Sequence, residues 1–132
     1  MGSTRRCTRP SGIGGFLTHS GWNSTMESIV EGVPMVCWPH HADQQMNSRF
    51  VGEVWKIGVD MKDTCDRLLV EKAVRDIMES KHNAITQSTN TWASLAKESI
   101  TEIGSSSIHL GPLIDDILAM TMNSTRMKIK NC

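Results

Sequence analysis

The fold is decided by residues 13–44, which read IGGFLTHSGWNSTMESIVEGVPMVCWPHHADQ. The short run at residues 16–18 predicts a strand, and a tight polar turn leads from it into a predicted helix over residues 23–31. The continuous apolar run at residues 34–38 predicts a second strand, of the kind that is buried on both faces of a parallel sheet. Each of these two strands is followed by a cluster of polar residues.

Strands and helices continue to alternate beyond this stretch. Gly32 stands in the usual helix-stop position, and residues 57–59 predict a third short strand. Further helices are predicted at residues 43–55, 70–80, 83–103 and 110–122, with a polar linker at 63–67 and a flexible break at 104–107. This order indicates an α/β fold, a partial Rossmann-like domain in which helices flank a short parallel sheet.

The composition excludes several classes of protein. The 132 residues fit one domain, and 14 Lys and Arg residues balance 14 Asp and Glu residues, so no strong field attracts nucleic acid or an anionic membrane. Aromatic residues make up only 5% of the chain, which disfavours a base-stacking surface. No apolar run approaches the roughly 18 residues that a membrane span needs.

The cysteines and the N-terminus bear on the compartment. Cys7, Cys37, Cys65 and Cys132 form neither a CxxC pair nor a zinc-ligand spacing, and Cys37 lies in an apolar run that predicts a buried thiol. The basic N-terminal residues have no apolar stretch behind them, so they do not form a secretory signal. We therefore expect a cytoplasmic protein.

The polar cluster after the first predicted strand is suited to a phosphate. A helix N-terminus offers free N–H groups and a partial positive charge, and Gly21 allows close approach or a positive φ. His19, Asn23 and Ser24 add side-chain donors. The alternative is a capping box, in which Ser24 and Glu27 satisfy the helix terminus without any ligand.

The polar cluster after the second predicted strand is suited to a polyol. Asp43 supplies a carboxylate that accepts hydrogen bonds from hydroxyl groups, and Gln44 supplies both a donor and an acceptor. Asp43 has an alternative interpretation as the N-cap of the helix that follows. A metal site at His40, His41 and Asp43 is disfavoured, because no further ligand has supporting spacing.

These residues resemble the signature box of plant UDP-dependent glycosyltransferases. The match is long and ungapped, and it comprises Gly15 to Ser24, Glu27, Gly32 to Met35, Trp38-Pro39 and Asp43-Gln44. Residues 47–50 and 55–67 look like the continuation found in members that glucosylate terpenoids and other small lipophilic acceptors. The resemblance runs from about Ile13 to Leu118.

The resemblance implies the C-terminal half of a two-domain GT-B enzyme that transfers a sugar, usually glucose, with inversion. It implies diphosphate ligands at His19, Gly21, Trp22, Asn23 and Ser24. Glu27 would then bind the ribose, and Asp43 and Gln44 the sugar. The implied partners are a nucleotide-sugar donor and a small-molecule acceptor, with no metal, no cofactor and no catalytic residue in this chain.

The sequence also departs from the family pattern. Ser20 replaces a Cys of the box, and His40-His41 stands where aromatic residues are common. Residues 1–10 occupy the place of a Trp-Ala-Pro-Gln segment whose Trp stacks on uracil in the family. The acceptor domain with its His–Asp base also has no counterpart, so the resemblance implies a chain truncated at its N-terminus.

Three segments are therefore expected. Residues 1–12 form a disordered leader outside the family, residues 13–122 an incomplete UDP-sugar-binding domain, and residues 123–132 a basic tail. One interpretation is the donor-binding part of a UDP-glycosyltransferase. The alternative is a catalytically inactive fragment that retains UDP-sugar binding or depends on a partner, and in either case we expect no sugar transfer by this chain alone.

Overall fold

The computed structural model describes residues 12–62 and 66–130, with side chains through residue 122. The predicted leader therefore lies outside the described residues except for Gly12, as does most of the predicted linker. The chain divides into two compact units, Met1–Ala96 and Lys97–Cys132.

The first unit is built on a three-stranded parallel sheet. Its strands are β1 (Phe16–Thr18), β2 (Met35–Cys37) and β3 (Gly58–Asp60), in the spatial order β1-β2-β3. Leu17 lies opposite Val36, and Val36 lies opposite Val59. The predicted α/β fold with a short parallel sheet is confirmed, and both predicted polar clusters follow neighbouring parallel strands.

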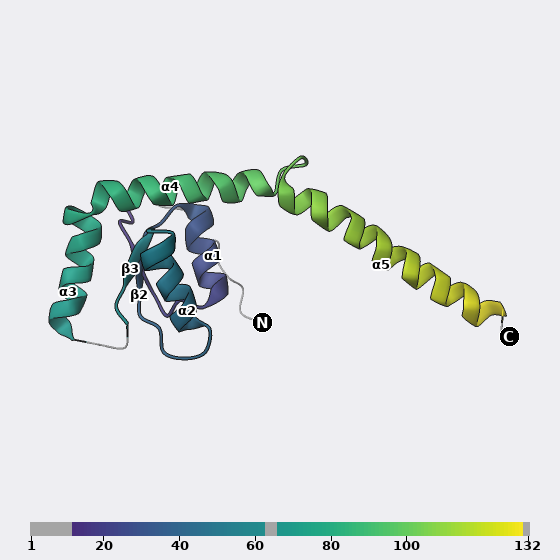
Figure 1. The fold of residues 1–132 in the computed structure, drawn as a ribbon, viewed down its shortest axis with the longest axis horizontal. Coiled ribbons are helices and arrows are strands. Elements are labelled where there is room, and N and C mark those ends of the chain that lie inside the picture. The colour runs from purple at the N-terminus through teal and green to yellow at the C-terminus, as the bar shows by residue number, and fades with distance from the viewer. Residues whose placement is uncertain (1–11, 63–65, 131–132) are drawn as a thin grey trace. The chain divides into compact units, whose positions relative to one another are not determined.

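Helices flank this sheet, as predicted. The first unit contains α1 (Trp22–Glu31), α2 (Gln44–Arg49), α3 (Arg67–Arg75), most of α4 (His82–Ser99), and two π-helical segments, η1 (Phe50–Val54) and η2 (Asp76–Ser80). In Figure 1, α1 and α2 lie on one side of the strands and α3 lies on the other. The π-helical segments prolong α2 and α3, so each of these predicted helices is present but changes its hydrogen-bonding pattern part-way.

The hydrophobic core lies on both faces of the sheet, because successive residues of β2 point to opposite faces. Met35 and Cys37 contribute to one buried cluster and Val36 to the other. The first cluster also contains Ile29, Val51 and Ile57, and the second contains Met61, Ala73, Ile77 and Ile85. This arrangement explains the unbroken apolar run of β2, which is fully buried.

The predicted helix stop at Gly32 is confirmed. Gly32 has a φ of 67°, and its N–H donates to Ile29 O at 3.0 Å. The N–H of Val33 donates to Ser28 O at 2.9 Å, so the end of α1 is closed by the chain that follows it. Glycine adopts this left-handed conformation without steric cost, and β2 can then begin directly after α1.

The second unit contains α5 (Ser105–Lys130). The predicted flexible break is wrong from Ser105 onward, and the last helix is longer than the predicted residues 110–122 at both ends. The chain turns between α4 and α5, where Thr101 N–H donates to Glu98 O and Gly104 N–H to Thr101 O. Within the described part of the chain, no helix is both long and apolar enough to cross a membrane.

Candidate functional site

The turn between β1 and α1 is held by a hydrogen bond from its backbone to the side chain of Thr18. Ser20 has a φ of 65° and is fully buried, and its N–H donates to Thr18 Oγ1 at 3.1 Å. Gly21 has an ordinary extended conformation, with φ −60° and ψ 145°. The left-handed residue is therefore Ser20 rather than Gly21, and a positive φ at Gly21 is not found.

Gly21 instead leaves room for the side chain of His19. A Cβ placed on Gly21 would stand 2.5 Å from His19 Nε2 and 3.2 Å from Cε1. The imidazole ring therefore lies directly against the glycine backbone, at the entrance to α1. Only glycine leaves room for the ring in this position.

The N-terminus of α1 carries no side-chain cap. The helix begins at Trp22 with Gly21 as N-cap, and a glycine has no side chain that could bond to the first amides of the helix. The predicted capping box at Ser24 and Glu27 is wrong, because Ser24 lies inside the first turn and not at the N-cap. The first N–H groups of a helix have no intrahelical acceptor, so these amides remain available to an anion.

The side chains predicted to bind the donor surround this terminus. His19, Trp22, Asn23 and Glu27 are exposed, and Ser24 is half-buried. Glu27 follows Asn23 by four residues, which places both on the same face of α1. Trp22 is 51% exposed, and its ring centroid lies 6.5 Å from that of Trp55.

The second polar cluster lies at the start of α2. The predicted N-cap position of Asp43 is confirmed, but its side chain bonds to no cap amide and so does not cap the helix. Gln44 is 8% exposed, and its Oε1 accepts hydrogen bonds from the N–H groups of His40 at 3.0 Å and His41 at 3.2 Å. Gln44 therefore shapes the loop after β2.

One residue that links the two clusters was not among the predicted site residues. Asn47 Nδ2 donates to Ser20 O and to Asp43 Oδ2, each at 3.0 Å. The only local signal was the four-residue spacing from Asp43, which places both side chains on one helix face. The contact with Ser20 joins residues 27 positions apart and has no local signal.

A buried polar group lies behind the turn. Burial raises the pKa of the Cys37 thiol to about 11, the Ser20 and Ser48 hydroxyls oppose the shift, and the Asp60 charge adds to it. Ser20 Oγ has no hydrogen-bond partner of good geometry among the described residues, so its contact with the sulfur is a weak one. The predicted buried thiol is confirmed.

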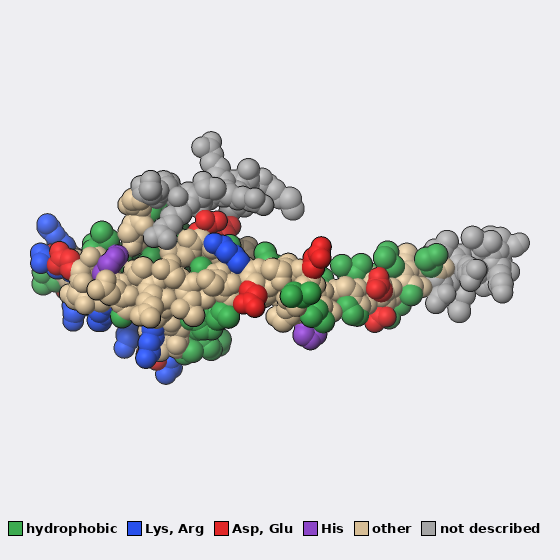
Figure 2. All heavy atoms as spheres, turned by 90° about the horizontal axis from the view of Figure 1, so that it is seen from above, with side chains coloured by type: hydrophobic (Ala, Val, Ile, Leu, Met, Phe, Trp, Pro, Cys, Tyr) green, Lys and Arg blue, Asp and Glu red, His purple; other side chains and the backbone are tan. Residues whose placement is uncertain are grey.

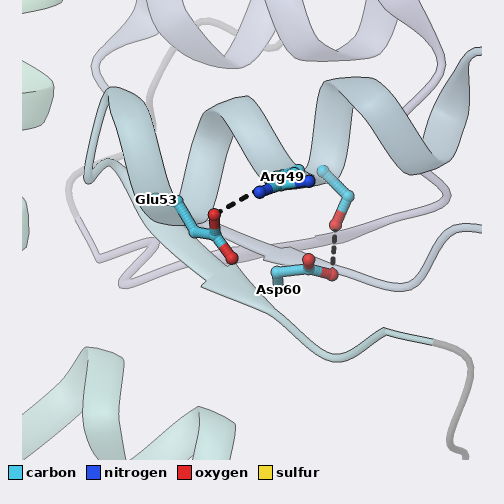
Figure 3. Close-up of polar contacts among 4 residues, drawn as sticks. Arg49, Glu53 and Asp60 are labelled. Carbon is cyan, nitrogen blue, oxygen red and sulfur yellow. Dashed lines mark hydrogen bonds and ion pairs between the residues drawn. The ribbon is translucent and has the colours of Figure 1, made fainter.

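Ser48 joins α2 to the end of β3. Its hydroxyl donates to Asp60 Oδ1 at 2.5 Å, and the same oxygen accepts from the N–H of Lys62 at 2.9 Å. Figure 3 shows the Asp60 carboxylate beside α2, with the surface ion pair of Arg49 and Glu53 on the adjoining turn. These contacts fix α2 against the sheet next to the site.

Two of the other tryptophans lie against the core, and a third lies beside a histidine ring. Trp55 and Trp92 pack against the core cluster with ring centroids 5.7 Å apart, and Trp38 lies 5.2 Å from the His40 ring. Among the described side chains, no three His, Cys, Asp or Glu residues are grouped so that they could hold a metal ion.

Comparisons with known proteins agree with this geometry. The family model described as "UDP-glucoronosyl and UDP-glucosyl transferase" matches residues 9–91. The chain is 59% identical over 108 residues to a 7-deoxyloganetic acid glucosyltransferase of Catharanthus roseus, covering 82% of this chain and 22% of the relative. It is 50% identical over 111 residues to a myricetin 3-O-rhamnoside 1,2-glucosyltransferase of Crocosmia x crocosmiiflora, covering 83% and 24%.

Solved structures of glycosyltransferases have the same fold. The Medicago truncatula enzyme UGT71G1, complexed with UDP-glucose, superposes with a TM-score of 0.72 at 34% identity, covering 80% of this chain and 24% of that one. Os79 of O. sativa, in complex with UDP, gives a TM-score of 0.71 at 35% identity over 77% of this chain. The chain spans about a quarter of the length of these relatives. Because the family model matches more than half of its residues, the chain belongs to the UDP-glucuronosyl and UDP-glucosyl transferase family.

Proposed function

We propose that this chain is the donor-binding part of a UDP-glycosyltransferase that transfers a sugar, glucose in our assignment, to a small lipophilic acceptor such as a terpenoid or phenolic. The observation that carries the proposal is the uncapped N-terminus of α1, which begins directly after His19 and Gly21. An anion at this point accepts hydrogen bonds from the first N–H groups of the helix, which have no intrahelical acceptor.

In this proposal the diphosphate binds at the turn before α1. The backbone of Gly21 and Trp22 and the side chains of His19, Asn23 and Ser24 donate to its oxygens. Charge-assisted hydrogen bonds of this type are among the strongest in proteins. Glu27 lies one turn further along the same helix face, at a position from which a carboxylate accepts hydrogen bonds from ribose hydroxyls.

The sugar binds at the neighbouring strand end. Asp43 is exposed, and it lies beside the turn because Asn47 hydrogen-bonds both to Asp43 and to Ser20 of the turn. In this proposal the Asp43 carboxylate accepts hydrogen bonds from the sugar hydroxyls. Gln44 uses its Oε1 for the His40 and His41 amides, which leaves its NH₂ group as the donor to the sugar. No metal is part of this proposed arrangement, in which backbone amides and the side chains of His19, Asn23 and Ser24 donate to the diphosphate oxygens.

The acceptor class follows from the relatives. One similar protein is named for 7-deoxyloganetic acid and another for myricetin 3-O-rhamnoside, and both names specify glucosyl transfer. Transfer also needs a base that deprotonates the acceptor, and the signature residues of this chain bind only the donor. We therefore expect no transfer of label from UDP-glucose to a terpenoid or flavonoid by the purified chain, and turnover would contradict this division of roles.

Titration calorimetry of the purified chain with UDP and UDP-glucose tests the proposal. We expect both to bind, UDP-glucose more tightly, and His19→Ala to weaken both by about tenfold or more, since it removes a hydrogen bond to a charged group. His109→Ala, an exposed histidine of α5, is the matched control and should bind as the parent chain does. A chelator should leave the affinities unchanged. Absence of binding by the parent chain would refute the proposed function.

A further inference from the structure

The side-chain amide of Asn47 connects the two halves of the proposed site. Asn47 is 8% exposed, and its Nδ2 has two hydrogens and two acceptors, Ser20 O and Asp43 Oδ2, each 3.0 Å away. The amide therefore donates one hydrogen to each of the two polar clusters. The bond to Ser20 is buried, whereas the bond to Asp43 is partly buried.

The first of these bonds fixes the turn before α1. Ser20 has a left-handed backbone, a strained conformation that a non-glycine residue keeps only where the surrounding structure holds it. Its N–H is held by Thr18 Oγ1 and its carbonyl by Asn47. The Ser20 carbonyl lies in the same peptide plane as the N–H of Gly21, so the hydrogen bond from Asn47 fixes the direction of that N–H at the N-cap of α1.

The second bond fixes the carboxylate of Asp43. Asp43 uses its side chain for no cap amide, and Asn47 lies one helical turn later. The hydrogen bond therefore selects one rotamer of an otherwise exposed side chain. The same NH₂ group thus orients both the Gly21 amide, which is proposed to bind the diphosphate, and the Asp43 carboxylate, which is proposed to bind the sugar.

We propose that Asn47 is a positioning residue that couples the diphosphate turn to the sugar-binding carboxylate. The inference rests on the proposed function and goes beyond it, because Asn47 itself contacts no ligand in the proposed arrangement. Loss of the amide should weaken UDP binding through the turn and also remove the preference for UDP-glucose over UDP. A residue that only stabilised the fold would not alter that preference.

Asn47→Asp tests the two donated hydrogen bonds most directly, because an ionised aspartate has the same shape as asparagine but no hydrogen to donate. It would face the Ser20 carbonyl and the Asp43 carboxylate with repulsion at both. In calorimetry on the full 132-residue chain, we expect UDP to bind about tenfold or more weakly and the affinity ratio of UDP-glucose to UDP to fall to about one. Asn83→Asp makes the same substitution at an exposed position of α4 and should change neither value.

Asp43→Asn separates the two arms of the amide. It removes the carboxylate but leaves the Ser20 bond, so it should abolish the preference for UDP-glucose while UDP itself binds as in the parent chain. Parent-like affinities and preference in Asn47→Asp would overturn the coupling. A parent chain that binds neither nucleotide would overturn the proposed function and the coupling with it.

Side-chain NMR of the parent chain keeps the inference testable should Asn47→Asp fail to fold. We expect the Asn47 NH₂ hydrogens to exchange with water much more slowly than those of the exposed Asn83, and their resonances to shift when UDP-glucose is added. Asp43→Asn should move one of the two hydrogen resonances far more than the other. Exchange as rapid as that of Asn83 would refute the bridge independently of any ligand.

Discussion

At the scale of single residues, Gly21 is the position where a minimal change tests the site. Alanine fits the backbone of Gly21, but its Cβ would displace the His19 ring, whose Nε2 lies 2.5 Å from that point. We expect Gly21→Ala to weaken UDP binding about tenfold while the melting temperature changes by about 5 °C or less, because an exposed ring moves and no core group does.

Calorimetry and thermal unfolding measure these two effects. Gly111→Ala is the control, because a Cβ at Gly111 meets nothing within 4 Å. Binding of UDP by Gly21→Ala as tight as that of the parent chain would show that His19 does not hold the diphosphate.

Cys37 gives the chain a pH dependence in the alkaline range. The thiol of the unfolded chain loses its proton near its ordinary pKa of 9.0, whereas the buried thiol keeps its proton to a pKa of about 11. The native state then binds more protons than the unfolded state between these values. The contribution of the protonated Cys37 thiol to the free energy of unfolding is therefore complete below pH 9. It is lost as the pH rises through 11, by about 3 kcal/mol in all.

Urea unfolding at several pH values between 7 and 11 measures this loss. Cys37→Ala has no thiol, so the part of the alkaline decline that is due to Cys37 should disappear in that variant. An identical decline in both proteins would show that other groups cause it.

At the scale of elements, Gly58 sets how closely β3 can approach β2. A Cβ at Gly58 would overlap the carbonyl oxygen of Met35 and stand 2.8 Å from Val51 Cγ1. Neither a strand carbonyl nor a buried Val can move without disturbing the sheet. We therefore expect Gly58→Ala to lower the free energy of unfolding by about 3 kcal/mol, measured by urea denaturation.

Gly15→Ala is the matched control for this substitution. A Cβ at Gly15 would lie 3.4 Å from Ile77 and 3.6 Å from the Pro34 oxygen, which are ordinary contact distances. Its stability should stay close to that of the parent chain. A similar loss in both variants would mean that glycine flexibility, and not the space between strands, decides the effect.

The elements show which features could be predicted from sequence. β1 and the end of α1 were predicted because their signals are local: a short apolar run, and a glycine that takes a positive φ. The prediction of a capping box was wrong because α1 begins earlier than the Ser24 pattern requires. The predicted start of α5 was wrong because Gly104 indicated a longer break, whereas the chain turns there and continues as helix from Ser105.

The site as a whole was predictable only where residues adjacent in sequence form it. The turn at His19 and the pair at Asp43 each follow a strand, and parallel pairing places those strand ends side by side. The Asn47 bridge depends on how α2 packs beside that turn, which no local pattern specifies. The same holds for the buried contacts of Cys37, which come from three separate segments.

At the scale of the whole molecule, apolar surface remains uncovered in each unit. Figure 2 shows hydrophobic side chains exposed along α5. Five of them follow the i, i+3, i+4, i+7, i+8 spacing of one helix face, and each is roughly half exposed: Leu110, Leu113, Ile114, Ile117 and Leu118. In the first unit, Phe16 and Leu17 of the edge strand β1 are 41% and 56% exposed.

An uncovered helix face of this kind drives association, because burying it against any apolar surface is favourable by roughly 25 cal/mol per Å². We therefore expect the isolated chain to self-associate, with a sedimentation coefficient that rises with protein concentration. Leu113→Glu combined with Ile117→Glu places two charges in the middle of the face and should shift the chain toward monomer.

The control is Ser105→Glu combined with Ala119→Glu, which adds the same charge away from that face, since each residue advances the helix by about 100°. If both pairs reduce association equally, net charge and not the α5 face is responsible. If neither pair does, the chains associate through a surface other than the α5 face, and the exposed edge at β1 is the next one to test.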